Sequence, residues 1–212
     1  MVGNDVVDLR DREAKPGTQS RRFDQRVFCA EERETLEDAR DRRWKLWAAK
    51  EAAYKVAVKQ DPATIFSPSR FRVSLEGEAE TGVVTWEAGR VRVRVAVEDG
   101  AVHAVATTTS NRLITGLDRL EPRRPSRREA KVLSQAVRSL ATRHLAVALG
   151  VDESAIEIRK QGRIPEIFIG GVRAPADLSL SHHGGVVGFA CEILEARRAE
   201  VTAGSLAHES AL

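Results

Sequence analysis

The spacing of apolar residues changes between the first helix-like stretch of this chain and the segment that follows it. Residues 30–60 contain no Pro or Gly, and Leu46, Ala53 and Ala57 recur there at helical spacing. Residues 91–97, VRVRVAV, instead alternate apolar and basic side chains, as a strand with one buried face does. A chain with both periods must combine helices with antiparallel sheet, which indicates an α+β fold.

The same patterns predict the elements of the first half of the chain. We expect a strand at residues 2–9 and at least two helices within 30–60, the second covering about 43–59. This helix should end at Asp61, because the residue before a proline is disfavoured in the helical conformation. Between residues 71 and 109 the alternation predicts an antiparallel meander of three strands.

The second half repeats this order. A linker is expected at residues 117–126, which contain two prolines, and a long helix at 127–149, ended by Gly150. The expected strands that follow cover residues 155–158, 167–169, 178–180 and 186–193. The repeated order predicts two related halves, each with a helix packed on a small antiparallel sheet. We expect the halves to span residues 1–116 and 117–195, followed by a flexible tail at 196–212.

Composition excludes several classes of protein. The 34 Lys plus Arg nearly balance the 31 Asp plus Glu, so the net charge of +3 gives no reason to expect nucleic acid as a partner. The two cysteines, Cys29 and Cys191, lie in no CxxC or Cys/His spacing, which argues against a zinc site or a disulfide framework. Neither a signal peptide nor an apolar stretch of membrane-spanning length is present. We therefore expect a cytoplasmic protein that binds no membrane.

Two segments in the first half could carry chemistry. Asp5 follows Gly3 in a strand, where a carboxylate can hold a hard cation such as Mg²⁺, although an aspartate next to a glycine can equally form a plain turn. In the helix at 43–59, Glu51 and Lys55 lie on one stripe, and Lys50 lies on the adjoining flank. The alternative is an exposed Glu–Lys pair that only supports the helix. The aromatic residues around the pair favour burial, and buried charges need partners or a bound ion.

Two segments in the second half could contact an anion. In LSLSHHGG, residues 178–185, a strand brings Ser181 and His182 to a glycine turn, where they could meet a phosphate or simply end the strand. Adjacent side chains of a strand point to opposite faces, which is poor geometry for a serine nucleophile and its histidine base. In QGRIPEI, residues 161–167, Arg163 lies on a turn between strands and could pair with a phosphate or remain solvated.

Taken together, these motifs resemble the 4'-phosphopantetheinyl transferase superfamily. That family has a glycine-x-aspartate near a strand end, a W/F-x-x-K-E-x-x-x-K helix, a G-K/R-P-like turn and a strand that ends in Ser-His. In this chain the motifs read VGNDVVDL, WAAKEAAYK, GRIPEI and LSLSHHGG. The segment RRFDQRVFCAEE is similar to the family's stretch between the first two motifs. The resemblance covers most of residues 2–193.

The resemblance implies a two-halved architecture with the halves in swapped order. The chain is similar in size to the larger, surfactin-synthetase-activating type of the family, a monomer of two pseudo-symmetric halves. Its motif order is that of the small holo-acyl-carrier-protein synthases, because the half with the aspartate comes first. A circular permutation would produce such an order. We therefore expect a monomer.

The resemblance also implies the activity. The expected reaction transfers the 4'-phosphopantetheine group of coenzyme A to a serine of an apo-acyl or apo-peptidyl carrier protein, with Mg²⁺, and releases 3',5'-ADP. Asp5 and Glu51 would bind the metal, since the larger type's second acid is replaced here by Val7. Lys55 would act with them in catalysis. The residues implied to bind the coenzyme are Lys50, His182, Ser181, Arg163, Arg128 and Lys131. An extra Ile164 separates Arg163 from the proline of its motif.

Two other functions compete with this interpretation. In a non-catalytic coenzyme A-binding or adaptor protein of the same fold, Asp5 and Glu51 would merely neutralise Lys50 and Lys55. A basic nucleic-acid-binding protein would show salt-sensitive association, and no motif favours it. The sequence does not identify the carrier protein or its pathway, and it leaves open which group removes the serine proton.

Overall fold

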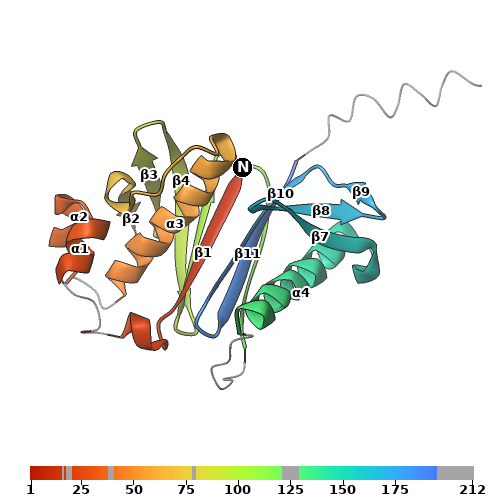
Figure 1. Ribbon diagram of the computed structural model, residues 1–212, viewed down its shortest axis with the longest axis horizontal. Coiled ribbons are helices and arrows are strands. Elements are labelled where there is room, and N and C mark those ends of the chain that lie inside the picture. The colour runs from red at the N-terminus through yellow and green to blue at the C-terminus, as the bar shows by residue number, and fades with distance from the viewer. Residues whose placement is uncertain (16, 18–20, 38–40, 78–79, 121–128, 195–212) are drawn as a thin grey trace, which may run out of the picture.

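The computed structural model describes residues 1–15, 17, 21–37, 41–77, 80–120 and 129–194. It shows a mixed α+β fold in which all strand pairs are antiparallel. Two layers of helix on sheet lie side by side, one around the helix α3 (Arg42–Gln60) and one around α4 (Glu129–Leu149) (Figure 1). The predicted α+β class is therefore confirmed.

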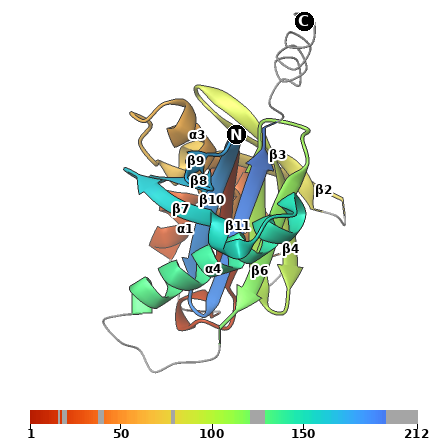
Figure 2. The same cartoon turned by 90° about the vertical axis from the view of Figure 1, so that its right-hand side faces the viewer.

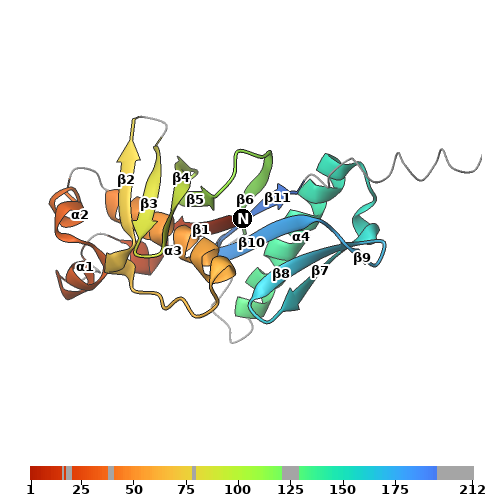
Figure 3. The same ribbon diagram turned by 90° about the horizontal axis from the view of Figure 1, so that it is seen from above.

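The first layer is a five-stranded sheet covered on one face by α3. Its strands, in spatial order, are β1 (Val2–Asp8), β5 (Ala101–Thr107), β4 (Gly89–Glu98), β3 (Thr81–Trp86) and β2 (Arg72–Glu76). Along β4, Val91, Val93 and Val95 are buried in the core that includes α3, and the arginines next to them are exposed. The alternation in the sequence thus becomes a sheet with one buried face. Two short helices, α1 (Arg21–Val27) and α2 (Ala30–Glu34), lie at the outer end of this layer (Figures 1 and 3).

The second layer has two three-stranded sheets. One contains β10 (Ala176–His183), β11 (Val186–Ile193) and β6 (Leu113–Arg119), and α4 crosses it (Figure 2). The other contains β7 (Ile156–Gln161), β8 (Ile164–Ile169) and β9 (Val172–Arg173), with β8 next to β10. Gly150, with a φ of +68°, ends α4, and the N–H of Val151 bonds back to the carbonyl of Ala146.

The two layers meet where β1 lies beside β10 (Figure 3). These strands belong to different sheets, and side chains of β10 accept hydrogen bonds from main-chain N–H groups of β1. Because both strands place every second group on the shared side, the bonds recur at every second residue. The donor–acceptor pairs are Val2 to Asp177 at 2.6 Å, Asn4 to Ser179 at 2.9 Å, Val6 to Ser181 at 3.3 Å and Asp8 to Nδ1 of His183 at 3.1 Å. We call these eight residues the β1–β10 seam.

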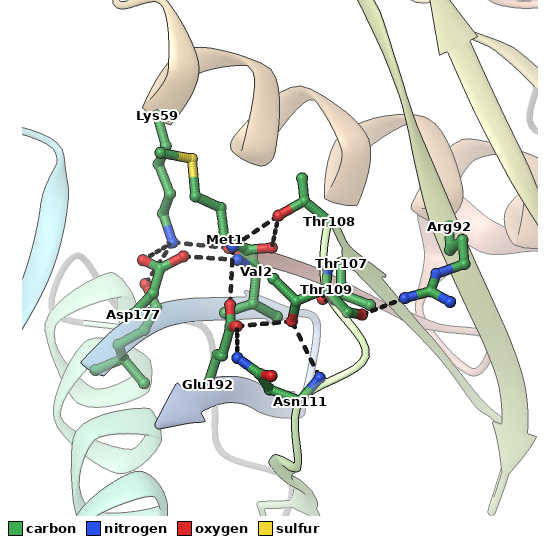
Figure 4. Close-up of polar contacts among 11 residues, drawn as sticks. Met1, Val2, Lys59, Arg92, Thr107, Thr108, Thr109, Asn111, Asp177 and Glu192 are labelled. Atoms are coloured by element: carbon green, nitrogen blue, oxygen red, sulfur yellow. Dashed lines mark hydrogen bonds and ion pairs between the residues drawn. The ribbon is translucent and has the colours of Figure 1, made fainter. Parts of the chain in front are cut away.

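A buried ion pair closes one end of the seam. Lys59, in the last turn of α3, lies 2.6 Å from Asp177 and donates hydrogen bonds to the carbonyls of Val2 and Leu178 (Figure 4). Beside it, the fully buried Glu192 accepts hydrogen bonds from Thr109, Asn111 and the amino group of Met1 (Figure 4). These contacts join α3, β1, β10 and β11 at one point.

Each layer has its own hydrophobic core. The first core consists of the alanine-rich face of α3 and the buried face of the five-stranded sheet. The second lies between α4, β10, β11 and the sheet of β7 and β8. Between them, a small cluster of Val6, Ala101 and Val186 accompanies the seam. The two layers are therefore joined by this small apolar cluster together with the hydrogen bonds and the ion pair of the seam.

Most of the predicted elements are confirmed, with three corrections. Both long helices and the strands around residues 2–9 and 186–193 form where they were predicted. The meander contains four strands instead of three, because β2 was missed: its polar residues face solvent, and its apolar ones are only half-buried. The linker predicted from residue 117 was wrong for residues 117–119, which belong to β6. The helical region also begins earlier in the chain than predicted, because α1 was not predicted.

The observed helices and strands do not test the predicted division into halves or the predicted tail. The division at residue 116 falls inside β6 and stays a prediction. The tail at 196–212 lies outside the described residues. Across the parts of the chain that are described, no helix combines the length and the apolar character needed to cross a membrane.

Candidate active site

A cleft lies where α3, β1 and β10 come together. Its cavity of about 360 Å³ is lined by Asp5, Val6, Trp47, Glu51, Lys55, Leu180, Ser181, His182 and His183. The strand β1 supplies Asp5, α3 supplies Glu51 and Lys55, and β10 supplies the serine and histidines. Both halves of the chain therefore contribute to this one cavity.

Gly3 allows β1 and α3 to come this close. A Cβ atom at this position would lie 2.1 Å from the carbonyl oxygen of Ala52 and 3.2 Å from the Cβ of Lys55. Only glycine fits such a contact between strand and helix. The glycine of the glycine-x-aspartate motif thus serves packing, and it brings the strand residue Asp5 under the helix residues Glu51 and Lys55.

Asp5 is held by groups from both halves. Its side chain is buried, and Oδ1 accepts a hydrogen bond from the ammonium of Lys55 at 3.0 Å and one from the hydroxyl of Ser181 at 2.8 Å. Lys55 also donates to the carbonyl of Asn4 at 2.7 Å. Within the described residues, no hydrogen bond reaches Oδ2 of Asp5.

Glu51 is a second carboxyl group in the same cavity, and it has fewer bonding partners than Asp5. It makes no hydrogen bond and no ion pair with any residue that the structure describes. Burial raises the pKa of Glu51 to about 7, helped by the negative charge of Asp5 and opposed by Lys55. A buried carboxylate beside another carboxylate is costly unless a cation joins them.

This set of donors fits a hard divalent cation. Mg²⁺ binds carboxylate oxygens and keeps several water molecules, so it needs only one or two protein ligands and an open cavity. Among the residues that the structure describes, Oδ2 of Asp5 has no hydrogen bond and the carboxylate of Glu51 has no hydrogen-bond or ion-pair partner. A cation between them would offset both the burial of the Glu51 carboxylate and its repulsion by Asp5.

A second cavity adjoins the first. Its volume is about 290 Å³, and Lys55, Leu180 and His182 line both cavities. The second cavity is also lined by four further basic side chains, which are Lys59, Arg138, Lys160 and Arg163. Partial burial, and then the charge of Lys55, lower the pKa of His182. An anionic ligand with an apolar portion would fit this second cavity.

Arg163 lies where the sequence predicted, in a two-residue turn between β7 and β8. Gly162, with a φ of +62°, forms the turn, and Arg163 faces the second cavity. The extra Ile164 begins β8 and lines the same cavity, so it does not remove Arg163 from it.

Lys50 was expected at a phosphate, and the structure does not bring it to the cleft. Its fully buried ammonium pairs with Glu32 of α2 at 2.7 Å and donates to the carbonyls of Pro68 and Phe71. Burial lowers the pKa of Lys50, and the charge of Glu32 opposes this. Lys50 therefore fastens α2 to α3 and has no proton left to donate to a ligand in the cleft.

Another predicted residue, Lys131, does not line either cavity. Lys131 is exposed near the start of α4. Arg128 lies outside the described residues. Ser181 lines the first cavity, but it is buried, and its hydroxyl is already bonded to Asp5 and to the N–H of Val6.

Sequence reasoning missed three basic residues of the second cavity. Lys59 follows Lys55 by four residues, so the helical stripe of Glu51 and Lys55 could have been extended to it. Arg138 lies in α4 and belongs to no recognised motif, and Lys160 lies three residues before Arg163 at the end of β7. Only the fold shows that these residues share a cavity.

The fold and the cleft agree with a comparison of the sequence with known families. The profile of the 4'-phosphopantetheinyl transferase superfamily matches residues 1–107, which include Asp5, Glu51 and Lys55. This is half of the chain, and the chain therefore belongs to that superfamily, whose general activity is phosphopantetheine transfer. No curated protein matches the sequence.

Proposed function

We propose that this protein transfers the 4'-phosphopantetheine group of coenzyme A to a serine of an apo-carrier protein, with Mg²⁺, and releases 3',5'-ADP. The proposal is carried by one observation: two carboxyl groups from separate elements, Asp5 and Glu51, line one cavity with Lys55. The adjoining basic cavity has the charge and apolar lining that a phosphorylated nucleotide requires.

Asp5 and Glu51 are the proposed metal ligands. Bound Mg²⁺ would neutralise charge on the pyrophosphate of coenzyme A. Lys55 would stabilise the charge that develops on the phosphate oxygens, while it keeps Asp5 oriented. His182, Arg138, Lys160 and Arg163 would bind the nucleotide end of the coenzyme in the second cavity. The three protons of Lys59 are already donated to Asp177 and to the carbonyls of Val2 and Leu178, so Lys59 would contribute only its charge there.

The reaction is a single displacement at the β-phosphorus of coenzyme A. The carrier serine oxygen forms a bond to phosphorus, and the bond from phosphorus to the oxygen of the departing 3',5'-ADP breaks. The serine proton leaves to a base, for which Glu51 and a water molecule are the candidates. The main contribution of the cleft is to hold the reacting groups in line and to neutralise their charge.

The proposed organisation is a monomer of two duplicated halves in swapped order, in the cytoplasm. Its support is the strand order. In the first half the strands lie in the spatial order β1, β5, β4, β3, β2. The strands β6, β11, β10, β8, β7 of the second half lie in a corresponding order, in which β10 contacts β8. Each half also places its long helix after its first strand. The proposed partners are coenzyme A and an apo-acyl or apo-peptidyl carrier protein.

A transfer assay tests the proposal. The protein is incubated with apo-carriers, coenzyme A and Mg²⁺, and mass spectrometry detects carriers that have gained the phosphopantetheine group. Asp5→Asn and Glu51→Gln should each reduce the rate by at least about 100-fold, because each removes a metal ligand. Glu87→Gln, in the exposed turn between β3 and β4, is the control and should retain full activity.

The outcomes separate the proposed function from its main alternative. A fully active Asp5→Asn enzyme would contradict the metal assignment. Coenzyme A binding by calorimetry without transfer to any carrier would instead indicate a non-catalytic binding protein.

A further inference from the structure

Two serines of β10 have the same place in the seam but different surroundings. Ser179 and Ser181 are both buried, and each accepts a hydrogen bond from a main-chain N–H of β1. Only Ser181 also donates a hydrogen bond to a carboxylate, to Oδ1 of Asp5 at 2.8 Å. Ser179 lines the second cavity, and Ser181 lines the first. The chain thus contains a natural comparison between a seam serine that does not bind Asp5 and one that does.

The hydroxyl of Ser181 is fully committed to these contacts. A hydroxyl has one proton to donate, and Ser181 donates it to Asp5. Its oxygen accepts from the N–H of Val6, which is the residue after Asp5. Ser181 is therefore bonded to the backbone and to the side chain of the same short segment, and it has no proton left for a phosphate.

These bonds restrict the orientation of Asp5. Lys55 and Ser181 approach the same oxygen, Oδ1, one from α3 and one from β10. With Oδ1 fixed by two donors, the carboxylate has one preferred rotation about its side chain, and Oδ2 remains without a hydrogen bond among the described residues. Hydrogen bonds of this kind to a metal-binding carboxylate usually tune its affinity for the ion.

We propose that Ser181 is a positioning residue: its hydroxyl orients Asp5 for metal binding and makes that orientation depend on the docking of the second half through the β1–β10 seam. This inference rests on the proposed function, and it differs from the sequence-based expectation that Ser181 contacts the coenzyme. The neighbouring residues of the LSLSHH segment thus have different contacts: Ser181 binds β1 through Asp5 and Val6, whereas His182 lines both cavities.

The test compares Ser181→Ala with Ser179→Ala. Mn²⁺ replaces Mg²⁺ as the probe, since both prefer oxygen ligands, and its binding to the protein with coenzyme A is measured by electron paramagnetic resonance. Ser181→Ala should weaken Mn²⁺ binding by about 10-fold or more, the usual effect of removing such a support. Ser179→Ala should change it by less than about 2-fold, although both variants lose one bond of the seam.

A second variant covers the case in which Ser181→Ala does not fold. Ser181→Cys keeps the size of the side chain but donates only weakly, so it should also weaken Mn²⁺ binding. The KM for coenzyme A gives an independent measurement. It should stay within about 2-fold of the wild-type value at saturating Mg²⁺ if Ser181 acts through Asp5, whereas a direct phosphate contact would raise it strongly.

The results distinguish this inference from the proposed function. If the wild-type protein transfers phosphopantetheine and the two alanine variants weaken Mn²⁺ binding equally, Ser181 is only structural and the inference is overturned. Unchanged Mn²⁺ binding in Ser181→Ala or Ser181→Cys overturns it as well. If the wild-type protein neither binds Mn²⁺ nor transfers the group to any carrier, the proposed function itself has failed, and this inference fails with it.

Discussion

In the metal-free protein, burial destabilises the ionised form of Glu51, and the other groups of the cleft do not offset this effect. Its pKa lies near 7, above the ordinary value of 4.5, because of burial and then the charge of Asp5. A carboxyl group with a raised pKa favours the folded state most below the pKa of the unfolded chain, near pH 4.5. This contribution is lost as the pH rises through about 7, where the buried group must ionise.

Glu51→Gln should therefore stabilise the metal-free protein at alkaline pH. At pH 8 in a chelator, the free energy of unfolding should rise by about 1–3 kcal/mol, because the variant has no buried charge at this position. At pH 5 the gain should shrink to less than about 1 kcal/mol, since Glu51 is then protonated in the folded state. Urea denaturation at both pH values measures the difference. An equal gain at both would show that the ionisation of Glu51 is not its source.

Several of the residues that the sequence singled out lie together in the fold, and their roles stay predictions. Asp5, Glu51, Lys55, His182 and Arg163 line the two adjoining cavities. Lys50 was misplaced because neighbouring residues of a helix point in directions about 100° apart, and the sequence does not say which flank faces the cleft. The flank of Lys50 faces Glu32, a contact between residues 18 positions apart that no helical spacing encodes.

At the scale of elements, Glu32 joins α2, α3 and β2. Its carboxylate accepts hydrogen bonds from Lys50, from the N–H of Cys29 at the start of α2 and from the N–H of Val73 in β2. The strand β2 was missed by the sequence prediction, and α2 was predicted only as one of at least two helices within residues 30–60. Their place in the fold depends on this one side chain, because β2 is an edge strand with only half-buried apolar residues.

Glu32→Ala should destabilise the fold far more than a substitution at its neighbour. The change leaves the ammonium of Lys50 buried without a carboxylate, which typically costs about 3–5 kcal/mol. Glu31→Ala, one residue earlier on the exposed side of α2, should cost no more than about 0.5 kcal/mol. Chemical denaturation of both variants gives the comparison. A loss below about 1 kcal/mol for Glu32→Ala would mean that water replaces the ion pair.

The strand β6 shows another limit of prediction from local sequence. Its glycine and its aspartate are typical of loops, and part of it was interpreted as a linker. The glycine is required by packing, since a Cβ at Gly116 would lie 2.4 Å from the ring of Phe189. Such a requirement comes from a residue more than 70 positions away, so it cannot be read from the segment itself.

At the scale of the whole molecule, the second cavity lies between the two layers. Lys59 comes from α3 in the first, and Arg138, Lys160 and Arg163 come from the second. No sequence motif joins these four residues, and only the docking of the halves assembles them. The two-layered order of elements could be predicted, whereas the contact between the layers could not.

Arg163→Ala should weaken the binding of coenzyme A without changing the fold. The loss of one charge-assisted contact should raise the Kd by roughly 5- to 30-fold, which corresponds to about 1–2 kcal/mol. Arg173→Ala removes an exposed arginine of β9 that does not line the cavity, and it should leave the Kd unchanged. Calorimetry with dephospho-coenzyme A tells whether the contact is to the 3'-phosphate, because the effect of Arg163→Ala should then disappear. Equal Kd values for both variants would exclude Arg163 from the binding site.

The seam has a consequence for how this chain can change by recombination. A backbone ladder accepts almost any side chains, but here the four acceptors are Asp177, Ser179, Ser181 and His183, and their alternation must match the free N–H groups of β1. Inserting or deleting a single residue within β10 would turn every acceptor away from its donor. A chimera that takes its second half from a relative would assemble only if that half carried hydrogen-bond acceptors at all four of these positions.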